Sequence, residues 1–309
     1  MNAKIALLLL LFSLCATICS AQPRRKATQR SSQREWISLF NGKDLTGWDI
    51  KIAGQPLNNN YKNTFRVDSN MIRIMYDQYD TFNGKYGHLY YNKPYSHYIL
   101  RFTYRFTGQQ TKGGASWNVR NSGVMVHSQS AASLTLGQDF PVSLEVQTLG
   151  GLSDAKTRYT ANLCTPGTQV YLKDKLTPDH CIDSKSKTYN GDQWVTITAV
   201  VLGDSIVHHI MEGDTVLTYQ RPQISAYFIA NGRNDWKAAH VDNADYWISR
   251  AGQPLGSGYI ALQAESHPID FKNIELLDLK GCTDPKALNY KSYYVKSDNT
   301  QCRYNKKVL

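Results

Sequence analysis

Polar and apolar residues alternate at both ends of the stretch 121–147. It opens with Asn-Ser-Gly-Val-Met-Val-His and closes with Ser-Leu-Glu-Val-Gln. Such alternation predicts two half-buried β-strands, in which residues two positions apart share a face. The polar faces would carry a carboxylate, amides and an imidazole, namely on Asn121, Gly123, Met125 and His127 and on Ser143, Glu145 and Gln147. If both faces line one concavity, a large share of the chain's reactive side chains converges there.

The same pattern continues along much of the chain. Residues 98–106 alternate without interruption, with Arg101, Thr103 and Arg105 on the polar face. Further short strands, separated by Gly, Asn and Asp turns, are expected at 65–68, 71–75, 194–202, 206–211, 215–219, 258–263 and 269–279. No helical periodicity of convincing length follows the N-terminal segment. This pattern predicts an all-β sandwich or jelly roll, formed as one domain by residues 35–280.

The N-terminus has a different pattern. Lys4 precedes an apolar run over residues 5–14, and Cys-Ser-Ala at 19–21 has the small residues of a signal-peptide cleavage site. The run is too short to span a bilayer, and no later segment of the sequence is long and apolar enough to do so. We expect a signal peptide over 1–21, a flexible basic linker over 22–34, and export to the periplasm, cell surface or extracellular space. Lipid attachment through Cys15 or Cys19 is the alternative.

The net charge of the chain excludes few classes of function. The formal net charge is +10, and removal of Lys4 with the signal would leave +9 (10 − 1). Five basic residues crowd the predicted linker, and the others are spread along the chain. Nucleic-acid binding is therefore not expected, since it calls for a concentrated basic patch.

Four cysteines remain after cleavage of the signal. An even number in an exported protein favours disulfides, and the most economical of the three connectivities joins Cys164 to Cys181 and Cys282 to Cys302. A zinc site is the alternative, but there is no CxxC pair and no histidine at ligand spacing. The second disulfide would close residues 281–309, which are too few to bury a core of their own.

Four separated motifs resemble the 3-keto-disaccharide hydrolase domain family over about residues 36–280. They are SLFNGKDLTGW from residue 38, NSGV from 121, LEVQ from 144, and GYIALQ from 258 followed by FKNI. The resemblance implies a concanavalin A-like β-sandwich that acts on glycosides oxidised to a ketone at C3, by hydrolysis or by elimination followed by hydration. Family members commonly have His-Gly after the last Leu-Gln, whereas this chain has Ala-Glu-Ser-His at 264–267. Residues from 281 resemble short Cys-bounded modules at the C-termini of exported bacterial proteins.

A ketone at C3 acidifies the proton on C2, so cleavage needs a base, a group that stabilises the enolate oxygen, and a proton for the leaving group. Glu145 is predicted to be the base or a metal ligand, because its apolar strand neighbours would desolvate it. His127 is predicted as acid, base or metal ligand, and Arg105 as the partner of the enolate. The alternatives are structural: Glu145 paired with Arg101 or Arg105, a structural strand histidine, and a cross-strand salt bridge for Arg105.

Four residues are expected to contact the carbohydrate substrate: Asn121, Gln147, Glu265 and His267. Asn121 could instead serve the turn before its strand, and Glu265 and His267 are placed at the rim of the site. A divalent metal polarising the sugar oxygens, or a structural calcium ion, would be compatible with the sequence, although no ligand spacing demands either. His208 and His209 point to opposite faces of one strand, and neither is assigned a role.

Two rival functions remain. The first is a glycan-binding sandwich without catalysis. The second is a retaining glucanase, which needs two carboxylates about 5 Å apart. The strand at 143–147 offers only Glu145, which favours chemistry with one base and one enolate stabiliser.

Overall fold

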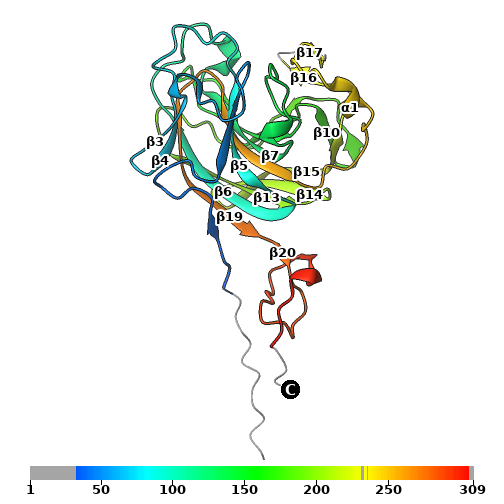
Figure 1. Cartoon of the computed structure of the whole chain (residues 1–309). Coiled ribbons are helices and arrows are strands. Elements are labelled where there is room, and N and C mark those ends of the chain that lie inside the picture. The colour runs from blue at the N-terminus through cyan, green and yellow to red at the C-terminus, as the bar shows by residue number, and fades with distance from the viewer. Residues whose placement is uncertain (1–32, 231–232, 235, 306–309) are drawn as a thin grey trace, which may run out of the picture. The chain divides into compact units, whose positions relative to one another are not determined.

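The computed structural model describes residues 33–230, 233–234 and 236–305. The predicted signal peptide and most of the predicted linker lie outside the described residues. Within the unit Arg34–Leu309, nearly all strands belong to two large antiparallel sheets (Figure 1). The described part of the chain contains one short α-helix, α1 (Ala244–Ile248), and none of its helices is long and apolar enough to cross a membrane.

The larger sheet has ten strands among the described residues. In spatial order they are β11 (Lys175–Leu176), β10 (Thr168–Leu172), β15 (Asp214–Ile224), β14 (Ile206–Met211), β13 (Val195–Leu202), β6 (His97–Phe106), β19 (Ile269–Asp278), β4 (Met71–Ile74) and β3 (Phe65–Asp68), with β1 (Ile37–Ser38) also paired to β19. The β3–β4 hairpin turns at Ser69 and Asn70, whose φ angles are 51° and 58°. Two successive positive φ values are the geometry that matches the twist of paired strands.

The smaller sheet has seven strands among the described residues. They are β12 (Cys181–Ile182), β9 (Asn162–Cys164), β8 (Leu144–Leu149), β7 (Asn121–Ser128), β18 (Gly258–Ala264), β5 (Gly87–Tyr95) and β2 (Trp48–Ile52). Two short pairs, β16 (Ile229–Ala230) with β17 (Arg233–Asn234) and β20 (Lys280–Gly281) with β21 (Lys296–Ser297), lie apart from both sheets. Single 3₁₀ turns are formed by η1 (Tyr61–Asn63), η2 (Ser116–Asn118), η3 (Ala131–Ser133) and η4 (Asn299–Gln301).

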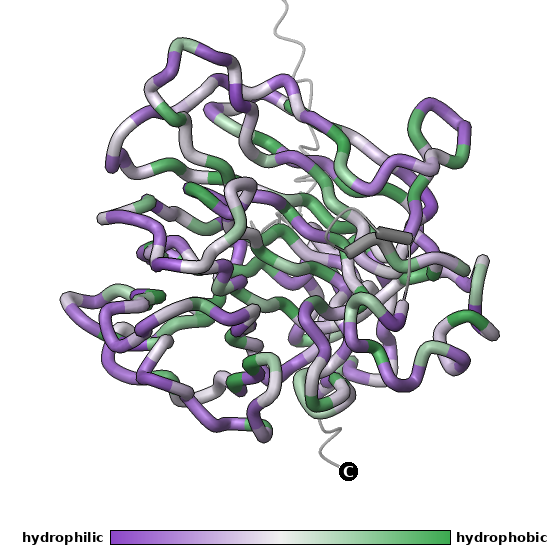
Figure 2. Tube along the Cα trace, turned by 90° about the horizontal axis from the view of Figure 1, so that it is seen from above, coloured by the Kyte–Doolittle hydropathy of each residue, from purple (hydrophilic) through white to green (hydrophobic). Residues whose placement is uncertain are grey.

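The core lies between the two sheets because the apolar positions of their strands face one another. In β6 the alternation predicted from the sequence is confirmed, with Tyr98, Leu100, Phe102, Tyr104 and Phe106 all buried. They join one core cluster with Leu89, Val124, Val146 and Leu262 of the smaller sheet. Hydrophobic positions run through the middle of the fold and hydrophilic ones follow its outer loops (Figure 2). The prediction of an all-β sandwich is confirmed.

A loop covers part of the outer face of the smaller sheet. Residues 129–143 leave β7, form η3 and return to β8. Ala131 and Leu134 of this loop pack on a second apolar cluster, which contains Tyr90, Met125 and Ala261 of the sheet. The loop is held by a glutamine pair, since Gln138 Nε2 donates to Gln129 Oε1 at 3.0 Å. The outer face is therefore buried where it would otherwise be open to solvent.

Both predicted disulfides are formed, Cys164–Cys181 and Cys282–Cys302. The first joins β9 to β12 at the end of the smaller sheet. The second closes the C-terminal segment, which is tied to the sandwich by backbone bonds from Leu279 N to His97 O (2.8 Å) and from Val295 N to Leu279 O (2.9 Å). Glu35 and Lys291 add an ion pair between the first described residues and this segment.

Candidate active site

A row of residues that are all polar except Gly123 crosses the outer face of the smaller sheet, with one residue from each of six strands. The cross-strand partners are Lys51 with His88, His88 with Gln263, Gly123 with Gln147, and Gln147 with Asn162. Val124 pairs with Leu262, so Gly123 and Gln263, one residue away from each, lie at the same level. Each residue of this row has at least one strand neighbour that belongs to the core, which places the row on the opposite face.

Glu145 leans over Gly123 into this row. A Cβ atom at position 123 would lie 2.3 Å from Glu145 Oε1 and 2.6 Å from its Cγ. Glycine is therefore required here to leave space for a carboxylate, and not for its backbone freedom. The side chain is buried, with 6% of the residue exposed, and burial raises the pKa of Glu145 from 4.5 to about 8.

Glu265 brings a second carboxylate to the same place. It follows β18, and continuing the register of that strand by three residues from Leu262 places it beside Asn121 and Tyr86. It is 2% exposed, so it is buried and not at the rim, where the sequence analysis placed it. Burial and the charge of Glu145 raise the pKa of Glu265 well above its ordinary value, against the opposing effect of Arg158.

Several amide and imidazole groups around the carboxylates are buried without a hydrogen-bond partner in the described protein. These are Asn118 Oδ1, Asn121 Oδ1, Gln263 Oε1 and Nε2, His88 Nε2, and Glu265 Oε2 itself. Leaving one such group unpaired costs about 1–3 kcal/mol, so a cluster of them marks a site prepared for a polar ligand. We call Glu145, Glu265, His88, Asn121 and Gln263 the acidic floor.

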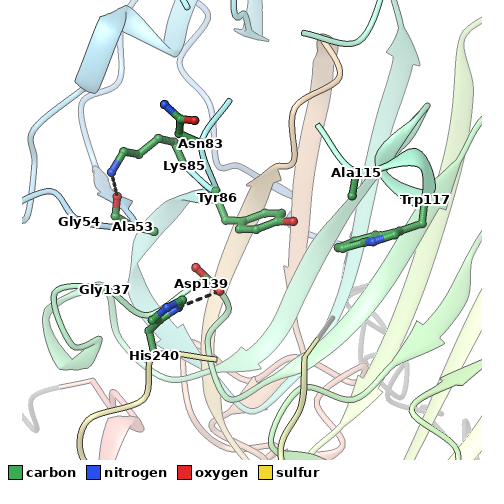
Figure 3. A pocket seen from close by; sticks show the side chains of 11 residues that line it. Ala53, Gly54, Asn83, Lys85, Tyr86, Ala115, Trp117, Gly137, Asp139 and His240 are labelled. Carbon is green, nitrogen blue, oxygen red and sulfur yellow. Dashed lines mark hydrogen bonds and ion pairs between the residues drawn. The ribbon is translucent and has the colours of Figure 1, made fainter. Parts of the chain in front are cut away.

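A cavity of about 530 Å³ is lined in part by Tyr86 (Figure 3), the residue that the strand register places beside Glu265. The Tyr86 hydroxyl accepts a hydrogen bond from Asn118 Nδ2 at 3.2 Å. Burial raises the pKa of Tyr86 to about 12, with smaller contributions from the charges of Glu265 and Asp139. Tyr86 thus lines the cavity and is also an electrostatic neighbour of Glu265.

The structure brings four of the predicted site residues together. Glu145, Asn121, Gln147 and Glu265 lie on the outer face of the smaller sheet, where Gln147 Oε1 accepts from Asn162 Nδ2 at 3.1 Å. His267 is buried at the edge of this group and packs against Phe106 with ring centroids 5.6 Å apart. Burial and the charge of Arg120 lower the pKa of His267 to about 4, and neither ring nitrogen has a hydrogen-bond partner in the described protein.

The prediction that His127 shares a face with Glu145 is wrong. Between Met125 and Ser128, β7 has one residue more than its partner β18 has between Ala261 and Tyr259. This bulge, with His127 at φ 50°, interrupts the alternation of side chains. The imidazole lies inside the sandwich instead, with Nε2 at 3.1 Å from Gly203 O and the ring centroid 6.0 Å from that of Tyr98.

Arg105 does not belong to the site either. It lies on β6 of the other sheet, where it forms a salt bridge with buried Asp270 at 3.0 Å and packs over Trp194 at 4.5 Å. Asp270 is also paired with Arg73 at 2.9 Å. The structural alternative for Arg105, a cross-strand salt bridge, is the observed one.

Arg158 is the cation that sequence reasoning missed. It follows β8 in a loop, where no alternation points to it, and its Nη1 donates to Gly150 O at 2.7 Å. Its charge lowers the pKa of Glu265 and, after the larger effect of Arg120, that of His267. In the sequence, only the position of Arg158 between two strands of the site could have pointed to it.

The described residues do not offer a metal centre. Among them, no group of three or more His, Cys, Asp or Glu is arranged to hold a metal ion. The imidazole of His209 is buried in the core, where Nδ1 lies 2.8 Å from Ala161 O. The acidic floor supplies acids, bases and hydrogen-bonding groups.

Residues 35–277 match the family model described as the 3-keto-alpha-glucoside-1,2-lyase-like domain. The chain belongs to this family. The match covers both carboxylates of the acidic floor and ends before the C-terminal segment. No curated protein matches the chain.

Solved structures similar to this lyase-like domain include proteins from two bacteria. A Parabacteroides distasonis protein that carries the description glycosyl hydrolase is 18% identical, with a TM-score of 0.45 over 79% of this chain and 93% of that one. A Bacillus subtilis protein of unknown function with a galectin-like fold is 10% identical, with a TM-score of 0.45 over 79% and 94%. The carbohydrate-binding module CBM66 from Bacillus subtilis is 9% identical, with a TM-score of 0.39 over 74% and 94%.

Proposed function

We propose that this protein is an exported enzyme that cleaves 3-keto-glycosides by removing the C2 proton and expelling the C1 substituent. The observation that carries the proposal is the pair of buried carboxylates, Glu145 and Glu265, on the polar face of a domain from the lyase-like family. Two neighbouring carboxyl groups that cannot easily both ionise supply a base and an acid together. That is the combination which β-elimination requires.

In this mechanism Glu145 acts as the base. Its carboxylate takes the proton from C2, and the electrons of the C–H bond form an enolate with the C3 carbonyl. The enolate collapses to restore the C3 ketone, a double bond forms between C1 and C2, and the C1–O bond breaks. Glu265 donates its proton to the departing oxygen. Addition of water across the new double bond would turn the elimination into a net hydrolysis.

The amides of the acidic floor would stabilise the enolate. Gln263 Nε2 has no hydrogen-bond partner in the described protein, and Asn121 Oδ1 is equally unpaired. A donor that is already buried and oriented stabilises a developing negative charge at little reorganisation cost. We assign Gln263 to the C3 oxygen and Asn121 and Gln147 to the sugar hydroxyls.

Glu145→Gln is expected to abolish turnover of a 3-keto-glucoside and to retain its binding. The amide keeps the shape of the side chain but cannot take a proton, so the loss falls on kcat. The measurement is release of the aglycone, with affinity followed by calorimetry. Glu275→Gln is the matched control, because Glu275 is paired with Arg101 on the other sheet and is expected to leave kcat unchanged.

Unchanged turnover in the Glu145→Gln variant would refute this assignment. If the wild-type protein binds 3-keto-glucosides but never releases an aglycone, the protein is a glycan-binding sandwich without catalysis. Running the reactions with and without a chelator tests separately whether a metal ion takes part.

A further inference from the structure

A second cavity lies on the outer face of the larger sheet, and its volume is about 390 Å³. Its wall is formed by β13, β14, the turn after β14 and the segment before β13, and includes Tyr189, Trp194, Thr196, Thr198, Ile210 and Glu212. Ile197 and Ala199, which alternate with the threonines, belong to the core, so the threonines point outward. This cavity and the acidic floor therefore lie on opposite faces of the sandwich.

Trp194 forms one side of this cavity and packs against two cations. Lys272 Nζ lies 3.8 Å and Arg105 Cζ lies 4.5 Å from the centroid of the Trp194 ring. These cations belong to β19 and β6, on one side of β13, whereas β14 lies on its other side (Figure 1). Cation–π contacts favour one position of an aromatic ring, so the indole offers the cavity a fixed apolar surface.

The rim of this cavity carries a carboxylate that is held in position. The Tyr189 hydroxyl donates to Glu212 Oε1 at 3.0 Å, and Lys187 Nζ donates to Glu212 Oε2 at 2.5 Å. Glu212 and Gly213 form the turn from β14 to β15, with φ angles of 53° and 94° that match the twist of paired strands. The Glu212 side chain is still 52% exposed. Its remaining lone pairs can therefore accept hydrogen bonds from a ligand.

This combination of groups favours a neutral sugar over other polymers. A pyranose ring has an apolar C–H face that stacks on an indole, and its hydroxyls donate to a carboxylate and exchange hydrogen bonds with threonine. A proline-rich peptide would also stack on aromatic rings, but its prolines have no N–H to donate to Glu212. An acidic polymer would bring its negative charges next to the same carboxylate, which is unfavourable.

We propose that this cavity is a second, non-catalytic site, and that its ligand is a neutral polysaccharide chain. Thr196, Glu212 and Gly213 of its wall are exposed, so sugar rings on either side of the bound one can extend over the open face of the sheet. Binding here holds the protein on a polymer and leaves the acidic floor, on the other face, accessible. The proposal does not depend on the reaction assigned to the acidic floor.

Affinity electrophoresis of the protein in gels that contain soluble starch, hydroxyethyl cellulose or dextran sulfate tests the proposal. At least one of the two neutral glucans is expected to retard the wild type, and Trp194→Ala should raise Kd about tenfold, as for loss of one ring-stacking contact. Glu212→Ala, a change in an exposed turn, should weaken binding several-fold at an unchanged Tm. Tyr246→Ala is the matched control, because Tyr246 is 49% exposed and lies on α1, outside this cavity.

Three results would overturn the proposal. The first is no retardation by either neutral glucan, or equal retardation of the wild type and the Glu212→Ala and Trp194→Ala variants. The second is loss of binding in Trp117→Ala alone, which would place the glycan in the cavity beside Tyr86. The third is retardation by dextran sulfate alone, which would indicate a surface for acidic polymers. Thermal melting checks the fold of each variant, and Glu212→Ala keeps the test decisive if Trp194→Ala does not fold.

Discussion

The carboxyl groups of Glu145 and Glu265 show at the scale of single residues how a folded chain creates reactivity. Each is an ordinary acid in water, but each is buried here, and the charge of one disfavours ionisation of the other. Gly123 contributes only by lacking a side chain, because any Cβ atom would collide with the Glu145 carboxylate. The alternation around residue 145 predicted the face of this carboxylate, and the apolar neighbours predicted its raised pKa.

The pH dependence of cleavage follows from that raised pKa. Glu145 must be ionised to take a proton, and burial raises its pKa to about 8. We therefore expect kcat/KM to be low at neutral pH and to rise as the pH passes through about 8. The measurement is a pH profile on a nitrophenyl 3-keto-glucoside, whose leaving group needs little help from an acid. In Glu265→Gln the rise should stay near pH 8, because burial is what raises the pKa of Glu145 and Glu265 is protonated, hence uncharged, when Glu145 acts as the base.

The raised pKa of Glu145 also makes the stability of the fold depend on pH. The dependence has the opposite sign to that of an ion-paired carboxylate. Because the pKa of Glu145 is raised in the folded state, the free energy of unfolding falls as the pH rises from the ordinary pKa of 4.5 to about 8. Glu145→Gln should therefore melt several degrees above the wild type at pH 8 and at about the same temperature at pH 4. A Tm difference that is independent of pH would contradict the raised pKa.

The strands and loops, one scale larger, set the limits of what the sequence could predict. Alternation is a local property, and it placed Asn121, Glu145 and Gln147 on the correct face. A bulge interrupts the alternation at His127, and the residues around His127 do not predict this extra residue. Glu265 approaches Glu145 through the pairing of β7 with β18, strands that are far apart in the sequence. A reading confined to one strand therefore counted a single carboxylate, and the second carboxylate removes that argument against a retaining glucanase.

Arg105 illustrates the same limit, because strand alternation cannot say in which sheet a residue lies. Its salt bridge with Asp270 is on the outer face of the larger sheet, and Asp270 is completely buried. Arg105→Gln should leave kcat unchanged and lower the free energy of unfolding by about 1–3 kcal/mol, because it removes one partner from a buried charge. Urea unfolding and aglycone release measure the two effects. A large fall in kcat without loss of stability would return Arg105 to the catalytic machinery.

At the scale of the whole molecule, one disulfide lies next to the candidate site and the other lies outside the family domain. Cys164 is the cross-strand partner of Glu145, so the bond to Cys181 fixes the strand next to the carboxylate. Cys282–Cys302 closes a segment beyond the family match, in which few of the described side chains are buried. The sequence predicted both pairings from economy, but the contact between Cys164 and Glu145 depends on strand pairing and could not be predicted.

Removal of each disulfide should accordingly have a different effect. Cys282→Ser with Cys302→Ser is expected to keep kcat and the main thermal transition and to open residues 283–301 to proteolysis, because the segment has almost no core of its own. Cys164→Ser with Cys181→Ser is expected to lower kcat and to reduce the free energy of unfolding by about 2–4 kcal/mol. Aglycone release, thermal melting and limited proteolysis of the two double variants compare them directly. An equal loss of kcat in the two double variants would mean that the C-terminal segment stabilises the acidic floor. That result would contradict the prediction.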